Sequence, residues 1–248
     1  MPYCLNIGNT HTEMALVLPA GLSDYRRWDT TLFLRDELPS DFPFVQEEIL
    51  AACVVPAVRE NLASRLDSRI HFLSVADYPE IDFSRYDCRT LGADRIANAA
   101  QAWHTCHEAV MVIDCGTAIN SEIISATGVF LGGAILPGRA MQFSCLQKFT
   151  AQLPLVNGKE ELPAPVGENT VDAILGGVGL GVIGAVKELI ERTKQLPDME
   201  NCRVLAVGGD SHYFLQAIPE LESGGNDFTL RGIAICQLKV GNDKTLSK

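Results

Sequence analysis

The chain has 248 residues, of which 47% are hydrophobic and 21% charged, a composition typical of a globular protein with one large core or two modest ones. Its formal net charge of -11 argues against the basic surface that nucleic-acid binding needs. No apolar run reaches the roughly 18 residues that span a bilayer, and no basic region precedes the first apolar segment. We therefore expect a cytoplasmic protein without a signal peptide that binds neither nucleic acid nor membranes.

The first half of the sequence alternates between strand-like and helix-like segments. The predicted elements are, in chain order, strands over 3–10, 12–19 and 24–34, a helix over 47–50, a buried strand over 51–55, a helix that begins at Pro56, a strand over 70–76 and a helix over 94–106. The last helix is inferred from alanine, isoleucine and tryptophan at helical spacing.

The second half opens with the same pattern. Its predicted elements are strands over 109–118, 119–127 and 128–138, helices over 139–152 and 168–196, a strand over 202–211 and a helix over 228–240. Such an internal repeat predicts two similar α/β lobes with mixed sheets, over 1–108 and 109–248. Three antiparallel strands with a glycine-rich first turn in each lobe indicate the duplicated ribonuclease-H-like fold of actin- and hexokinase-like ATPases.

The predicted helix over 168–196 is diluted by glycine, which costs about 0.5–1 kcal/mol per interior position relative to alanine. Four of its glycines are Gly177, Gly179, Gly181 and Gly184. They predict that another helix or backbone approaches this helix closely.

The spacing of cysteine and histidine indicates neither a disulfide nor a metal site. The eight cysteines are scattered without a close pair, and the five histidines show no metal-ligand spacing. We therefore expect reduced thiols that pack as small hydrophobic side chains.

Two glycine-rich turns, "IGNT" at 7–10 and "DCGTA" at 114–118, follow strand-like runs in the two halves. Each would present backbone N–H groups and a hydroxyl, an array that binds phosphate oxygens. A facing pair would clamp a polyphosphate, the Asp114 carboxylate would hold a cation against it, and adenine would lie on Gly208 and Gly209. One such turn alone is also ordinary hairpin chemistry, but the paired occurrence favours the nucleotide site.

Asp94 and Arg95 lie between a glycine turn and the start of an alanine-rich helix. Asp94 has two interpretations that the residues alone leave open. It is either a helix cap that satisfies free amide groups, or a general base beside the anion anchor Arg95.

Nine segments that keep the family's order over nearly the whole chain make the sequence similar to type III pantothenate kinases. They are "IGNT" (7–10), "ACVVP" (52–56), "LGADRIANA" (91–99), "VIDCGTA" (112–118), "GGAILPG" (132–138), "LQKFTAQLP" (146–154), "GENTVDAILGG" (167–177), "VGGD" (207–210) and "LRGIA" (230–234). The resemblance implies ATP-dependent phosphorylation of pantothenate to 4'-phosphopantothenate, the first step of coenzyme A synthesis. It also implies magnesium, a potassium or ammonium ion beside ATP, and a homodimer whose interface lies in the 109–248 lobe.

The resemblance also assigns site residues, with Asp94 as the proton acceptor and Asp114 as the ligand of the monovalent cation. The pantothenate contacts that it implies are Tyr86, Gly92, Ala93, Asp94, Arg95 and, at the dimer interface, Thr170. The ATP contacts are Asn6, Ile7, Gly8, Asn9, Thr10, His11, Thr12, Glu13, Thr117, Gly208 and Gly209.

Three departures from the family pattern surround the inferred phosphate and cation site. Asn6 stands where the family has aspartate, Glu13 replaces a basic residue, and Asn120 with Glu122 replaces threonine and aspartate. We expect weaker magnesium capture from the first departure and repulsion of the phosphates from the second. A non-catalytic relative that binds pantothenate or nucleotide as a sensor or regulator is therefore the alternative. A kinase or hydrolase for another hydroxy acid is a third hypothesis.

Overall fold

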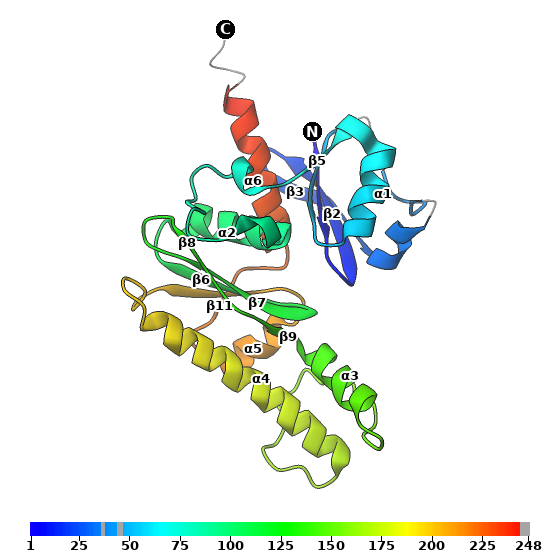
Figure 1. The fold of residues 1–248 in the computed structure, drawn as a ribbon, viewed down its shortest axis with the longest axis vertical. Helices are drawn as coiled ribbons and strands as arrows, with labels where there is room; N and C mark the ends of the chain where they lie inside the picture. Colours follow the sequence, from blue (N-terminus) through cyan, green and yellow to red (C-terminus); the bar gives the residue numbers. More distant parts are fainter. Residues whose placement is uncertain (36–37, 44–46, 244–248) are drawn as a thin grey trace. The chain divides into compact units, whose positions relative to one another are not determined.

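The computed structural model describes residues 1–35, 38–43 and 47–243. The chain folds into two compact units (Figure 1). One consists of Met1–Thr105 together with the C-terminal segment from Asp227, and the other of Cys106–Asn226. The C-terminal segment therefore departs from the predicted 109–248 lobe, because its helix packs in the first unit.

The described part of the N-terminal unit contains a five-stranded sheet in the order β3-β2-β1-β4-β5. Its strands are β1 (Tyr3–Ile7), β2 (His11–Leu18), β3 (Gly21–Asp29), β4 (Ile49–Cys53) and β5 (Ile70–Phe72). β1, β2 and β3 form an antiparallel meander, whereas β4 and β5 continue the sheet in parallel with β1. This mixed sheet places the β1–β2 turn at the same edge as the end of β4.

Helices of this unit are α1 (Pro56–Leu66), α2 (Ala93–Cys106) and α6 (Phe228–Asp243), with 3-10 helices η1 (Thr30–Leu34), η2 (Asp67–Arg69), η3 (Val75–Asp77) and η4 (Cys88–Thr90). α1 buries Val58 and Leu62 against the sheet, and α6 packs on β1, β2 and β4 (Figure 1). Gly232 lets α6 touch α2, because a Cβ atom there would lie 2.0 Å from the Ala97 carbonyl oxygen. These contacts join segments distant in sequence, so no local pattern assigned α6 to this unit.

The described part of the C-terminal unit contains a sheet in the order β11-β10-β6-β7-β8, with β9 paired to β7. Its strands are β6 (Val110–Cys115), β7 (Ala118–Ile124), β8 (Phe130–Gly132), β9 (Ile135–Pro137), β10 (Arg203–Val207) and β11 (Glu222–Ser223), and its helices are α3 (Arg139–Phe149), α4 (Thr170–Lys194) and α5 (Ser211–Ala217). α4 packs against the sheet through Val182, Val186 and Ile190. The unit repeats the antiparallel opening of the first unit, β6–β7–β8, as predicted.

Four predicted elements are wrong in part. The strand over 70–76 ends at Phe72, because Ser74 and Asp77 form the capping box that starts η3. The strand over 24–34 ends at Asp29, whose carboxylate accepts a hydrogen bond from Thr31 N and caps η1. The predicted helix over 47–50 does not form, because Ile49 and Leu50 belong to β4. The strand over 128–138 breaks at Gly133, where a Cβ atom would lie 1.7 Å from the carbonyl oxygen of Ser121.

In the described part of the chain, α4 is the one helix long and apolar enough to cross a membrane. Half of its most apolar 18-residue window is buried inside the protein. Core helices of globular proteins can be equally long and apolar, so this single helix is weak evidence for a membrane span.

Candidate functional site

The β1–β2 turn has an exposed tip. The turn is closed by a hydrogen bond from Gly8 N to the carbonyl oxygen of His11, at 3.0 Å. Asn9, Thr10 and His11 are exposed, and Gly8 is half-buried. This tip, where the sequence predicts a phosphate contact, is therefore exposed to solvent.

Two residues next to this tip have side chains that point into the protein. Ile7 and Thr12 are fully buried. The Thr12 hydroxyl lies 3.0 Å from that of Thr30, which donates to the Gly8 carbonyl oxygen at 2.8 Å. Thr12 thus braces the turn from below, and only the backbone of Ile7 and Thr12 remains for a ligand.

Asn6 carries a buried acceptor atom that receives no hydrogen bond from the described residues. It lies in β1 directly opposite Glu13 of β2, so the two side chains share one face of the sheet. Asn6 Oδ1 is buried and accepts no hydrogen bond from the described residues. Such atoms are rare in proteins and are often explained by an ion or water. An amide oxygen beside a carboxylate is an oxygen donor pair of the kind that magnesium takes, so the residues present fit this ion.

Glu13 has a cation beside it that the sequence does not indicate. Arg27 lies opposite Glu13 in the β2–β3 register, with 3.6 Å between Arg27 Nε and Glu13 Oε1. Both side chains are partly exposed, so solvent screens their attraction. The pair is nevertheless close to neutral as a unit. Repulsion of phosphates by Glu13 is therefore weaker than its charge alone suggests.

In the C-terminal unit, the ends of the parallel strands β6 and β10 bring oxygen atoms together. Val207 pairs with Asp114, and Gly208 follows directly. A Cβ atom at Gly208 would lie 2.5 Å from Asp114 Oδ1 and 2.7 Å from the carbonyl oxygen of Cys115. A carboxylate and a carbonyl oxygen form a hard donor set, which fits the potassium or ammonium ion expected at Asp114. Asn120, one of the departures, lies opposite Asp114 on β7.

The two glycines of this turn differ in what surrounds them. Gly208 has φ +85° and is crowded by Asp114 and Cys115, whereas a Cβ atom at Gly209 would have open space within 4 Å. We expect Gly208→Ala to lower the free energy of unfolding by about 1–3 kcal/mol, since it combines left-handed backbone with a clash. Gly209→Ala is the matched control and should stay within about 0.5 kcal/mol. Urea unfolding of both variants checks this, and equal destabilisation would contradict it.

Two further residues, whose pairing no sequence pattern indicates, hold this turn in place. Arg139, at the start of α3, forms a two-pronged ion pair with Asp210, including a 2.6 Å bond from Nε to Oδ2. Asp210 N in turn donates to the carbonyl oxygen of Cys115 at 2.9 Å. Arg139 directly follows the segment "GGAILPG" and Asp210 ends the segment "VGGD", but their pairing across 71 positions has no sequence signal.

On the same side of this unit, Gly138 N donates to the carbonyl oxygen of Thr117 at 3.0 Å. A Cβ atom at Gly138 would lie 2.3 Å from the carbonyl oxygen of Gly116, so only glycine fits against the β6–β7 turn. Thr117 is exposed at the tip of that turn.

The predicted acceptor-site residues of the N-terminal unit lie together. Arg95 is 4% exposed, and its Nη1 lies 3.4 Å from the Tyr86 hydroxyl, with the guanidinium 5.9 Å from the centre of the Tyr86 ring. Asp94 Oδ1 accepts a hydrogen bond from Arg95 N at 2.8 Å. A Cβ atom at Gly92 would lie 2.5 Å from Asp94 Oδ1. Gly92 thus makes room for the carboxylate at the start of α2, where Ala93 is buried.

The Asp94 carboxyl has a raised pKa. Burial is the main cause, because it disfavours the charged form, and the Arg95 N–H bond and guanidinium charge offset it in part. A carboxylate whose pKa is raised accepts a proton more readily than an exposed aspartate does. The cap and the general-base interpretations are therefore compatible. One carboxylate oxygen, Oδ1, accepts the hydrogen bond from the helix amide of Arg95, and the other is the one that would accept a proton.

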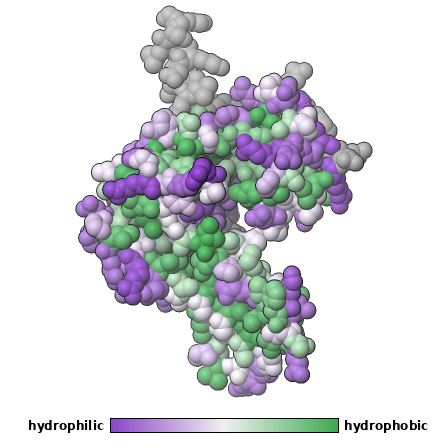
Figure 2. All heavy atoms as spheres, in the orientation of Figure 1, coloured by the Kyte–Doolittle hydropathy of each residue, from purple (hydrophilic) through white to green (hydrophobic). Residues whose placement is uncertain are grey.

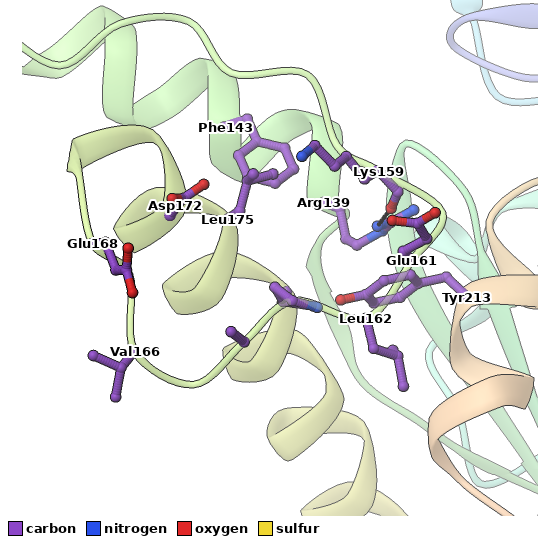
Figure 3. Close-up of a pocket in the computed structure, with 13 residues that line it drawn as sticks. Arg139, Phe143, Lys159, Glu161, Leu162, Val166, Glu168, Asp172, Leu175 and Tyr213 are labelled. Carbon is purple, nitrogen blue, oxygen red and sulfur yellow. Dashed lines mark hydrogen bonds between the residues drawn. The ribbon is translucent and has the colours of Figure 1, made fainter.

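Thr170 and a nearby cavity belong to the C-terminal unit. Thr170 is exposed at the first turn of α4, where Asn169 caps the helix through the amide of Asp172. A cavity of about 310 Å³ lies beside that turn, and Figure 3 shows Arg139 over the ring of Tyr213 at one end of it. Its walls are Arg139, Phe143, Lys159, Glu161, Leu162, Pro163, Ala164, Val166, Glu168, Asp172, Leu175, Gly179 and Tyr213. None of the predicted ATP or pantothenate contacts lines it.

The family model for type III pantothenate kinase matches residues 3–192, which is most of the chain. The type III pantothenate kinase of Endomicrobium trichonymphae is 32% identical over 257 aligned residues, covering 95% of this chain and 98% of that protein. The chain belongs to the type III pantothenate kinase family. The predicted resemblance is therefore confirmed.

Solved structures show the fold of this family member. A Campylobacter jejuni protein described as a conserved Baf family transcriptional activator matches with a TM-score of 0.67 and 23% identity, over 97% of this chain and 99% of that one. MreB5 of Spiroplasma citri, bound to ADP, matches with a TM-score of 0.54 and 12% identity over 98% of both chains. At these identities the likeness concerns the fold alone. It confirms the predicted duplicated ribonuclease-H-like fold for this chain.

Proposed function

We propose that this protein transfers the terminal phosphoryl group of ATP to the terminal hydroxyl of pantothenate, which gives ADP and 4'-phosphopantothenate. Family membership supports the reaction, and the grouping of Asp94, Arg95, Tyr86 and Gly92 is the single observation that carries it. Asp94 would accept the hydroxyl proton, and the buried Arg95 guanidinium would bind the pantothenate carboxylate. The cytoplasm, where coenzyme A synthesis would use the product, is the proposed location.

The nucleotide would contact the two glycine-rich turns. In the N-terminal unit, the exposed tip Asn9–His11 offers backbone donors to phosphate, and Asn6 with Glu13 would hold magnesium. In the C-terminal unit, Asp114 and the Cys115 carbonyl oxygen would hold potassium or ammonium, with Thr117 and Gly209 towards ATP. Bound metal ions would supply charge neutralisation for the transferred phosphoryl group.

We propose different roles for Gly208 and Gly209. Its Cβ position is filled by the oxygen atoms of Asp114 and Cys115. We therefore assign it to the support of the cation site rather than to a flat adenine platform. Gly209, with open space around it, keeps the proposed contact with the nucleotide.

The decisive experiment is a coupled assay of purified protein with pantothenate, ATP, magnesium and potassium. We expect 4'-phosphopantothenate by mass spectrometry and stimulation by potassium. Lack of product at millimolar ATP, with manganese tried in place of magnesium, would overturn the kinase proposal. Calorimetric binding of pantothenate in that case would support the non-catalytic alternative, which the Asn6 and Glu13 departures motivate.

We propose that α4 forms the homodimer interface. Gly177, Gly181 and Gly184 follow one face of the helix, and nothing described lies within 4 Å of their Cβ positions. Of the four glycines named in the sequence, only Gly179 has another described segment close by, since its Cβ would lie 2.5 Å from the Tyr213 hydroxyl. Bare backbone on the other three suits a second helix. Exposed apolar side chains extend this surface over α3, α4 and the segment between them (Figure 2): Phe149, Leu155, Val166, Val171 and Leu180.

The dimer proposal predicts a clear effect of charge on this face. Gly181→Arg should convert a dimer into a monomer, because it puts a long cation where a second copy would pack. Sedimentation velocity measures the change. Ala63→Arg, at an exposed position of α1, adds the same single charge and is the control, which should remain dimeric. A dimeric Gly181→Arg protein would contradict the assignment of the interface to α4, where Thr170 would complete the pantothenate site.

A further inference from the structure

Three side chains of different elements meet at the edge of the N-terminal sheet. They are His71 of the edge strand β5, Asp77 at the end of η3, and the buried Cys236 of α6. Their ligand atoms all lie within 4.8 Å of one another. His71 Nε2 is 2.8 Å from Asp77 Oδ1, and Cys236 Sγ is 3.8 Å from the same oxygen. We propose that these three residues bind a zinc ion, which pins α6 to the edge of the sheet.

The carboxylate of Asp77 is held for this role by a second set of contacts. Its Oδ2 accepts hydrogen bonds from Ser74 N at 2.7 Å and Ser74 Oγ at 3.1 Å, in a capping box at η3. Oδ1 is thereby turned towards His71 and Cys236. Metal-binding carboxylates are commonly oriented by outer-shell hydrogen bonds of this kind.

The geometry and the donor types suit zinc. Nitrogen, oxygen and thiolate ligands at about 2.0–2.3 Å define a tetrahedral site, in which neighbouring ligand atoms are roughly 3.4 Å apart. The observed 2.8 and 3.8 Å lie on either side of that value, so small side-chain rotations suffice to admit the ion. The carboxylate and the thiolate together balance its two positive charges. His71 is exposed on the open side, which leaves a fourth position for water.

The spacing of residues in the sequence could not indicate this site. The proposal revises the expectation that the histidines bind no metal. Asp77 and Cys236 are 159 positions apart, and the entire C-terminal unit, Cys106–Asn226, lies between them in sequence. An ion that joins them closes a very long loop. It stabilises the folded chain because it binds the assembled cluster and has no such site in the unfolded chain. The zinc would therefore be structural and independent of the kinase reaction.

Metal content tests the proposal. Full-length protein is treated with chelator, desalted, incubated with a small excess of zinc and desalted again, and the bound metal is measured by mass spectrometry. We expect one zinc ion per chain and a higher melting temperature with the ion. Cobalt in place of zinc should give a thiolate-to-metal charge-transfer band. Cys236→Ser should lose that band, and His71→Gln should weaken zinc binding by more than the roughly 10–100-fold typical of losing an outer-shell partner.

Matched controls identify the site. Cys145→Ser and His212→Gln change an exposed cysteine and an exposed histidine elsewhere and should bind zinc as the parent does. Circular dichroism with chelator present establishes that all four variants fold. The proposal is overturned if the parent holds less than stoichiometric zinc, or if folded Cys236→Ser and His71→Gln retain its affinity. Because the readout is metal content, failure of the kinase assay leaves this test unaffected.

Discussion

Asp94→Asn is expected to lower kcat for pantothenate phosphorylation by about 10²–10⁴-fold, the range that a positioned general base contributes. The amide keeps the shape and can still accept the hydrogen bond from Arg95 N, but it cannot take the hydroxyl proton. Steady-state assays and a circular dichroism spectrum measure activity and fold together. Asp87→Asn, which alters an exposed aspartate paired with Arg89, is the control and should keep near-parental activity.

The pH dependence of kcat/KM distinguishes a catalytic Asp94 from an aspartate that only stabilises the fold. Activity requires the ionised Asp94, and burial raises its pKa, so the acid limb of log(kcat/KM) should lie at higher pH than for an exposed aspartate. The Arg95 charge lowers that pKa, so Arg95→Ala should move the limb further up in pH, apart from its effect on KM. Full activity of Asp94→Asn, or a limb that moves down in Arg95→Ala, would contradict the assignment.

Asn6→Asp is expected to raise kcat/KM for magnesium-ATP by on the order of 10²-fold, comparable to one preorganised charged contact. The substitution puts a full negative charge at a buried oxygen that has no hydrogen-bond donor among the described residues. A bound magnesium ion compensates that charge, and the ion-free protein should be destabilised by it. Initial rates at varied magnesium and thermal melts with and without magnesium-ATP measure both effects.

A substitution at Glu13 distinguishes two hypotheses about this site. If it shares magnesium with Asn6, Glu13→Gln should reduce activity, whereas repulsion of phosphates would make the same variant faster. The 3.6 Å pairing with Arg27 favours the first outcome. Asn201→Asp adds the same charge at an exposed position of the other unit and should leave the rate unchanged. A slower Asn6→Asp enzyme would mean that this oxygen faces something other than a cation.

The local elements of the fold were largely predictable because their causes lie within a few residues. Pro56 starts α1, the alanine-rich segment forms α2, and the two strand–turn–strand openings repeat. One error occurred where a contact from another strand decides the geometry. Gly133 breaks a strand only because the Ser121 carbonyl oxygen occupies its Cβ position. The short α5 and β11 had no pattern long enough to be recognised.

The amino-acid sequence was sufficient to infer the family, the duplicated architecture and the grouping of the "LGADR" residues at one helix start. The motifs follow one another in the family's order along the chain, and a helix start depends on a few neighbouring residues, so both can be predicted from the sequence. The structure was needed to show that α6 packs in the N-terminal unit, that Arg139 pairs with Asp210, and that Glu13 has Arg27 beside it. Those features depend on contacts between distant segments, whose partners no spacing in the sequence encodes.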